Sequence, residues 1–157
     1  MAQRTFQPAD PAFAERVRAS FARQGFMREI GARIAALTPG SCEIELDYHD
    51  RLSQQHGYFH GGIVGTLADN AGGYAAFTLM PADASILTVE YKISLLAPAA
   101  GERLSARGTV VRAGHTLTVC RSSVYVRKGE NERLCAEGLV TLMALHDQPD
   151  APPDSAA

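Results

Sequence analysis

The chain has 157 residues, of which 46% are hydrophobic and 20% are charged, and its formal net charge is −2. This length suits a single domain, and the charge offers no basic field for nucleic acid. No segment has the length and apolar character of a membrane span or a signal peptide, so we expect a cytoplasmic protein with neither nucleic acid nor a membrane as a partner. The three cysteines share no CxxC spacing, and we expect them to pack as buried thiols in a reducing compartment.

Two segments flank the predicted domain, which we place at residues 28–146. Residues 1–27 are predicted to form a helical extension, because Asp10 followed by Pro11 is typical of a helix start and apolar residues then recur every fourth position. We expect this helix to dock onto the domain. The acid- and proline-rich segment 147–157 offers nothing to bury and is predicted to be a disordered tail.

Within the domain, the hydrophobic period predicts two strands, one long helix and four further strands. From Ile30 apolar residues alternate, which indicates a hairpin that turns at TPGS. A glycine-rich apolar helix then begins near Gly61. The first strand after it alternates again, with Leu87 and Tyr91 in the core-facing set and Thr88 on the opposite, polar face. This order predicts an α+β domain in which one curved antiparallel sheet wraps the helix.

One carboxylate, Asp69, lies in the middle of the apolar helix. Glycines three, four and seven residues away leave its helical face nearly bare of side chains. A carboxylate in such a slot suits a general base or nucleophile, because burial makes it reactive and the missing side chains admit a substrate. An aspartate that is partly exposed, or that is satisfied by a threonine or a backbone group, is the alternative that this feature alone leaves open.

The start of the helix is a second polar feature. His60, Gly61 and Gly62 open it, and a helix N-terminus offers unpaired amides and partial positive charge to a polarised carbonyl. The same residues also suit a simple turn. His60 and Gln54 are candidates to orient the loop or to bind the substrate. His56 and His60 are four residues apart, but neither a third ligand nor HExxH accompanies them, so we expect no metal.

The spacing between the two features constrains how they can act together. Gly61 and Asp69 are eight residues apart, which at about 1.5 Å per residue is about 12 Å along one helix. One small carbonyl group cannot contact both. If both act on the same bond, they come from two chains whose helices run antiparallel across a two-fold interface, so the sequence predicts a homodimer with two shared sites.

Three sequence features together resemble a known family. These are HGYFHGG at residues 56–62, the aspartate nine residues after its second histidine, and LTVEYKISLLAPA on the following strand. They resemble the PaaI-like acyl-CoA thioesterases of the hotdog-fold 4HBT superfamily over about residues 28–145. The resemblance implies a homotetramer built as a dimer of dimers that hydrolyses an acyl-CoA to a free acid and CoA. It implies no cofactor, since coenzyme A is part of the substrate.

The resemblance also implies a role for each matching residue. Asp69 would act as the nucleophile or as the base that activates water, and the Gly61 amide would polarise the thioester carbonyl. His60 would support the site, and Gln54 would lie near the leaving thiolate. Thr88 would help to hold the water.

Four further residues are candidates for substrate contact. Gly62 and Asn70 flank the two polar features, and Arg112 and His115 lie in the hairpin sequence RAGHT, where family members often bind the nucleotide. The Arg112 guanidinium offers a planar fork to a phosphate, with an ordinary solvated arginine as the alternative. Two other functions stay open: an enoyl-CoA hydratase or dehydratase on the same fold, and a non-enzymatic acyl-CoA-binding regulator.

Overall fold

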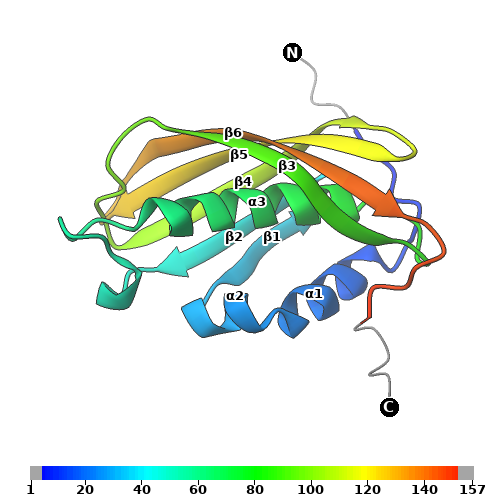
Figure 1. The fold of residues 1–157 in the computed structure, drawn as a ribbon, viewed down its shortest axis with the longest axis horizontal. Coiled ribbons are helices and arrows are strands. Elements are labelled where there is room, and N and C mark those ends of the chain that lie inside the picture. The colour runs from blue at the N-terminus through cyan, green and yellow to red at the C-terminus, as the bar shows by residue number, and fades with distance from the viewer. Residues whose placement is uncertain (1–4, 152–157) are drawn as a thin grey trace.

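Six antiparallel strands form one sheet that wraps around a long helix (Figure 1). The computed structural model describes residues 5–151. The strands lie in the order β1-β2-β4-β5-β6-β3, and every neighbouring pair is antiparallel. The elements are α1 Phe13–Arg23, α2 Gly25–Ile30, β1 Arg33–Thr38, β2 Ser41–Asp47, η1 Asp50–Leu52, α3 Gly61–Phe77, β3 Ser85–Leu95, β4 Arg103–Ala113, β5 Leu117–Lys128 and β6 Asn131–Leu145. The predicted α+β hotdog fold is confirmed.

Helix α3 packs very close to the inner face of the sheet because glycines remove side chains from the contact. A Cβ atom on Gly108 of β4 would lie 2.1 Å from the carbonyl oxygen of Ala71, and one on Gly72 would lie 3.0 Å from Ser122 Oγ of β5. Any side chain at Gly108 would therefore push the helix away from the sheet. The close packing fixes the position of the middle of α3, where Asp69 lies.

The N-terminal region differs from the prediction in its details. Helix α1 begins at Phe13 rather than at Pro11, because residues 11–12 form a turn in which the Phe13 amide donates to the Asp10 carbonyl. The Asp10 carboxylate accepts a hydrogen bond from the amide of residue 12, as expected of a cap. A second helix, α2, occupies the segment where a strand was expected to begin at Ile30. It ends at Gly31, which has a left-handed φ of 84° that favours glycine, and β1 begins at Arg33.

The residues after β6 return to α1. The Asp150 carboxylate pairs with the Arg23 guanidinium at 2.5 Å, and the Asp150 carbonyl also accepts a hydrogen bond from it. Residues 152–157 of the predicted disordered tail lie outside the described residues. The described part of the segment therefore contacts the first helix, which bears on the site below.

A bulge in β3 changes which side chains face the helix. The register with β6 shifts at Val89, between Thr88 and residue 90. Thr88 pairs with a buried leucine of β6 and Tyr91 pairs with a buried valine, so both face α3. Tyr91 faces the core as predicted, but the faces predicted for Thr88 and Leu87 are reversed, because the extra residue in the bulge shifts the alternation between residues 88 and 91.

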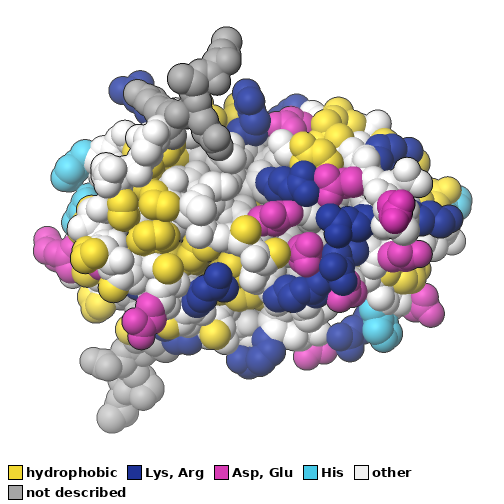
Figure 2. All heavy atoms as spheres, turned by 180° about the vertical axis from the view of Figure 1, so that it is seen from behind, with side chains coloured by type: hydrophobic (Ala, Val, Ile, Leu, Met, Phe, Trp, Pro, Cys, Tyr) yellow, Lys and Arg dark blue, Asp and Glu magenta, His cyan; other side chains and the backbone are white. Residues whose placement is uncertain are grey.

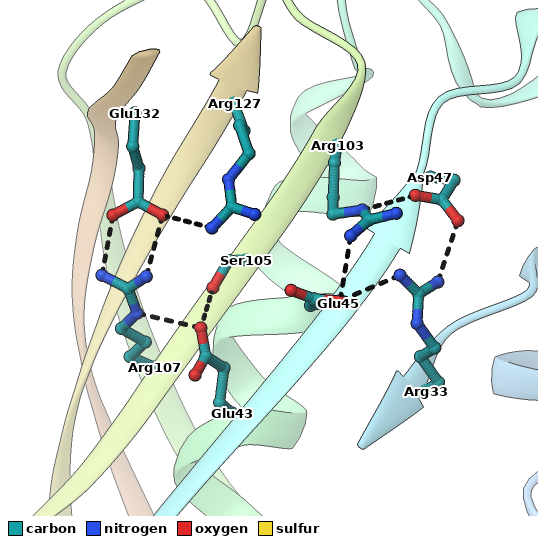
Figure 3. A network of polar contacts seen from close by, with 9 residues as sticks. All are labelled: Arg33, Glu43, Glu45, Asp47, Arg103, Ser105, Arg107, Arg127 and Glu132. Atoms are coloured by element: carbon teal, nitrogen blue, oxygen red, sulfur yellow. Dashed lines mark hydrogen bonds and ion pairs between the residues drawn. The ribbon is translucent and has the colours of Figure 1, made fainter. Parts of the chain in front are cut away.

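The outer face of the sheet carries alternating basic and acidic side chains over part of its area (Figure 2). Arg107 on β4 contacts Glu43 on β2 at 3.0 Å and Glu132 on β6 at 2.8 Å. The whole network joins nine residues (Figure 3): Arg33, Glu43, Glu45, Asp47, Arg103, Ser105, Arg107, Arg127 and Glu132. Each carboxylate in it accepts a hydrogen bond from an arginine, so this half of the face suits contact with solvent.

The three cysteines are free and buried. Burial raises the pKa of the Cys42 and Cys120 thiols to about 12, so almost no thiolate forms at neutral pH. The predicted packing role is confirmed. Within residues 5–151, no helix is both long and apolar enough to cross a bilayer.

Candidate active site

Asp69 lies halfway along α3 and is only partly exposed. Its carboxylate accepts a hydrogen bond of 2.9 Å from the Thr88 hydroxyl on β3. The bulge makes this contact possible, since it places Thr88 on the helix side of the strand. Burial raises the pKa of the Asp69 carboxyl above its ordinary value, and the hydrogen bond from Thr88 opposes that rise. The result is a carboxylate with few competing partners and increased basicity, which suits a base or nucleophile.

Asp69 opens into a depression of about 450 Å³ between α3, β3, β6 and α1. Asn70 and Thr88 line the same depression. The Asn70 side-chain amide donates to the Thr66 carbonyl at 3.0 Å. A backbone carbonyl only accepts, so the Asn70 side-chain oxygen points away from this bond and is available to a ligand.

The helix start presents an unused amide. His60 caps α3, and its Nδ1 accepts a hydrogen bond of 2.9 Å from the Gly62 amide. A neutral His60 ring therefore carries its proton on Nε2. The amides of residues 63 and 64 donate to the His60 carbonyl. Among residues 5–151, the Gly61 amide donates no hydrogen bond, which leaves it free for a carbonyl oxygen.

Gly61 and Gln54 line a second depression, of about 340 Å³, with Val64 and the end of β3. The Gln54 side-chain oxygen accepts a hydrogen bond from the backbone amide of His56. The backbone amide of Gln54 donates to the Tyr58 carbonyl at 2.9 Å. These bonds hold the loop before α3 in a turn. The structure thus brings Gln54 and Gly61 together, as it does Asp69, Asn70 and Thr88.

The two groups do not meet within one chain. Gly61 and Asp69 line different depressions and are eight residues apart on one helix, or about 12 Å along its axis. Arg112 and His115 lie at the β4–β5 hairpin, where the His115 ring stacks on His146 at a centroid distance of 4.5 Å. His115 lines a separate depression by the C-terminal end of α3. Within residues 5–151, no three metal-ligating side chains are grouped to hold an ion.

Two residues that the sequence did not suggest, Ser20 and Gln24, also line the Asp69 depression, together with Tyr74. Ser20 and Gln24 belong to the N-terminal region, which the sequence assigned only a docking role. A signal was present, because Val17 is buried in α1 and positions 20 and 24 continue its helical spacing with polar side chains. A polar pair on the buried stripe of an amphipathic helix indicates a hydrogen-bonded contact or a site.

The Thr88 hydroxyl is expected to set the pH at which Asp69 ionises. Replacing Thr88 with valine keeps the shape and removes the bond that favours the carboxylate, so the pKa of Asp69 should rise further. If activity requires the ionised carboxylate, the acidic limb of the kcat/KM profile should move to higher pH. Thr141→Val is the matched control, since it removes a threonine–carboxylate bond of 3.2 Å to Glu90, outside the Asp69 depression. An unshifted Thr88→Val profile would contradict this role.

Comparisons with known proteins show which family this chain resembles in sequence and in fold. A model of the thioesterase superfamily matches residues 56–133. A thioesterase family protein from Silicibacter pomeroyi is 49% identical, with a TM-score of 0.84 over 85% of this chain and 98% of that one. A Halobacterium salinarum protein with a provisional esterase assignment is 34% identical over 64% of this chain and 69% of its own length. The Escherichia coli PaaI protein, from the phenylacetic acid degradation operon, is 18% identical with a TM-score of 0.79 over 90% of this chain and 99% of that one, a shared fold.

Proposed function

We propose, from the premise that this chain belongs to the thioesterase superfamily, that it hydrolyses an acyl-CoA thioester to a carboxylic acid and CoA. One observation carries the proposal. A single helix presents a basic carboxylate, Asp69, and an unused amide, Gly61, in two separate depressions. Each is half of what hydrolysis of an ester-type carbonyl requires, namely a base or nucleophile and an oxyanion donor.

A two-fold axis beside α3, halfway between Gly61 and Asp69, would complete both sites. Three side chains of β3 lie in order along α3. The Thr88 hydroxyl donates to Asp69. The Tyr91 side chain lies beside Gly65, and the Leu95 side chain lies beside Gly61. Residue 65 is midway between residues 61 and 69. An axis beside Gly65 and Tyr91 would therefore set Gly61 of one protomer opposite the partner's Asp69, and repeat the arrangement on the other side.

The exposed surface of β3 supports this dimer. It is an edge strand of the sheet, and Tyr91 and Leu95 are 50% and 60% exposed. Edge strands with apolar side chains invite pairing with another chain. Antiparallel pairing of β3 with its partner copy would bury these side chains and would run the two α3 helices antiparallel, as the shared site requires.

In the proposed reaction the thioester carbonyl lies between the two half-sites. The Gly61 amide, with the partial positive charge of the helix start, would stabilise the negative charge that develops on the carbonyl oxygen. The partner's Asp69 would attack the carbonyl or remove a proton from the attacking water, with Thr88 holding the water. His60 would keep the first turn aligned through Gly62, and Gln54 would lie near the departing thiolate.

Coenzyme A and a second dimer would occupy surfaces outside this centre. Arg112 has no ion-pair partner within residues 5–151, so it and His115 are proposed contacts for the nucleotide phosphates, and Gly62 and Asn70 for atoms nearer the thioester.

On the outer face, a hydrophobic cluster lies beside the charged field (Figure 2). Leu87 and Leu117 flank a methionine of β6 there. We propose that this cluster joins two dimers. Light scattering should give a tetramer, and an active monomer would contradict both interfaces.

Thiol release from a panel of acyl-CoAs tests the proposed function. Acyl groups that differ in length and in aromatic character should be hydrolysed at different rates, and at least one should give turnover well above the uncatalysed rate. The same protein incubated with an enoyl-CoA should release thiol without hydrating the double bond. Hydration without thiol release would identify a hydratase, and binding without either reaction would identify a regulator.

A further inference from the structure

The N-terminal helix closes one end of the depression that holds Asp69. Tyr74 lies five residues beyond Asp69 on α3, about 7.5 Å along the axis. Gln24, at the end of α1, donates a hydrogen bond of 2.8 Å to the Tyr74 hydroxyl, and Ser20 Oγ lies 3.2 Å from the same oxygen. All three residues line the depression. We refer to Ser20, Gln24 and Tyr74 as the polar end wall.

The end wall is firmly held. Tyr74 and Ser20 are 5% and 7% exposed. The Phe21 ring meets Tyr74 edge to face at a centroid distance of 5.5 Å, which fixes α1 against α3. Burial therefore leaves little freedom for the Tyr74 hydroxyl to move aside. An acyl group that enters from Asp69 meets a fixed wall after a short distance, which limits its length.

The end wall is polar but carries no net charge. Gln24, Ser20 and Tyr74 are neutral, and no donor within residues 5–151 occupies the Gln24 side-chain oxygen. Arg23 lines the same depression, but its charge is paired with Asp150, which lines it too. A hydrocarbon end would cover these polar groups without replacing their hydration. A carboxylate end would meet no unpaired cation among the described residues that line the depression. The negative charge of Asp69 in the same depression would also repel it.

A neutral hydrogen-bonding group meets neither penalty. A hydroxyl at the end of the acyl group can donate to the free oxygen of Gln24, and the Asn70 side-chain oxygen offers a second acceptor in the same depression. Ser20 and Gln24 precede residue 56, where the match to the superfamily begins. Any selection that they exert therefore belongs to the N-terminal region of this chain.

We propose that the polar end wall selects short acyl groups that end in a neutral hydrogen-bonding group such as a hydroxyl, with Gln24 and Tyr74 as the residues that determine specificity. This inference rests on the proposed thioesterase function. It assigns the acyl group to the depression of Asp69, and the thiol side of the substrate to the partner's depression at Gly61.

The test uses three CoA thioesters of equal, short acyl length that end in a methyl, a hydroxyl or a carboxylate. For the wild-type protein, kcat/KM should be at least about tenfold higher for the hydroxyl thioester than for the methyl one, because the wall loses a hydrogen bond to the methyl group. The carboxylate thioester should be the poorest substrate. Tyr74→Phe and Gln24→Leu should each reduce the preference for the hydroxyl thioester over the methyl one.

Matched controls remove the same groups elsewhere. Tyr125→Phe, on the face where Arg107 stacks on that ring, and Gln7→Leu, at an exposed position, should keep the wild-type preference. A preference that is unchanged in both wall variants, or a wild-type preference for the methyl thioester, would overturn the inference.

A binding measurement separates the inference from the proposed function. If none of the three thioesters is hydrolysed, thioesterase activity towards this class is contradicted. Calorimetric dissociation constants of the same three compounds for the wild-type protein then test the wall by itself. The hydroxyl thioester should bind most tightly, and equal affinities would overturn the inference.

Discussion

Replacing Asp69 with asparagine is expected to lower kcat for acyl-CoA hydrolysis by about a thousandfold, within the range found for a lost general base. Asparagine matches the aspartate in shape and can still accept the hydrogen bond from Thr88. It has no carboxylate to attack a carbonyl or to take a proton from water. Substrate binding should change little, so the loss should appear in kcat and not in the dissociation constant. Thiol release and calorimetry measure the two quantities.

The same substitution should not weaken the fold, which separates chemistry from stability. Burial raises the pKa of Asp69 in the native state above its value in the unfolded chain. The native state therefore holds the proton more tightly, and this group's contribution to stability is lost as the pH rises through the raised pKa. At neutral pH, Asp69→Asn removes a buried charge and should leave Tm equal or higher. Wild-type kcat in this variant on every acyl-CoA that the protein hydrolyses would exclude Asp69 from the reaction.

Replacing Gly61 with proline is expected to lower kcat by about a hundredfold or more, the usual cost of losing one oxyanion donor. Proline has no amide N–H, and Gly61 is the first residue of α3, where proline is well tolerated because that N–H has no intrahelical partner. The preceding residue, His60, has φ −62° and ψ 137°, the extended conformation that proline requires before it. The substitution therefore removes the proposed donor with little disturbance of the helix.

Gly61→Ala is the matched control for Gly61→Pro. Its Cβ atom would lie 3.1 Å from the end of the Leu95 side chain, as the proline Cβ would, and that flexible side chain can move. Alanine keeps the N–H, so kcat should stay within a few-fold of wild type while Gly61→Pro loses activity. Equal losses in both variants would assign the effect to steric contact and would remove the amide from the mechanism.

The fold was predictable because its signals are local. Alternating strands, a small-residue helix and short turns indicate the α+β sheet and α3, and the spacing of Gly61 and Asp69 on that helix follows from its geometry. The bulge at Val89 was not predictable, because it depends on the register with β6 and leaves no mark in the alternation of β3. For the same reason the sequence placed Thr88 on the wrong face of its strand.

The end of the substrate depression was also beyond local signals. Gln24 and Tyr74 are 50 residues apart in the chain, and their hydrogen bond exists only once α1 has docked on α3. Polar residues on a short N-terminal helix have an ordinary solvated alternative, so the pattern alone could not assign them to a site. Their position beside Asp69 became visible only from the packing of the two helices.

The central claim is that each active site takes Gly61 from one chain and Asp69 from the other, and a mixed dimer tests it most directly. Chains with Asp69→Asn and chains with Gly61→Pro, carrying different tags, are co-expressed, and the mixed species is purified. Each variant alone should keep about a hundredth of the wild-type kcat or less. The mixed dimer has one intact site, formed by the Gly61 of one chain and the Asp69 of the other, and one site that lacks both groups. It should show about half of the wild-type kcat per dimer. A mixed dimer as inactive as its parents would contradict the shared site.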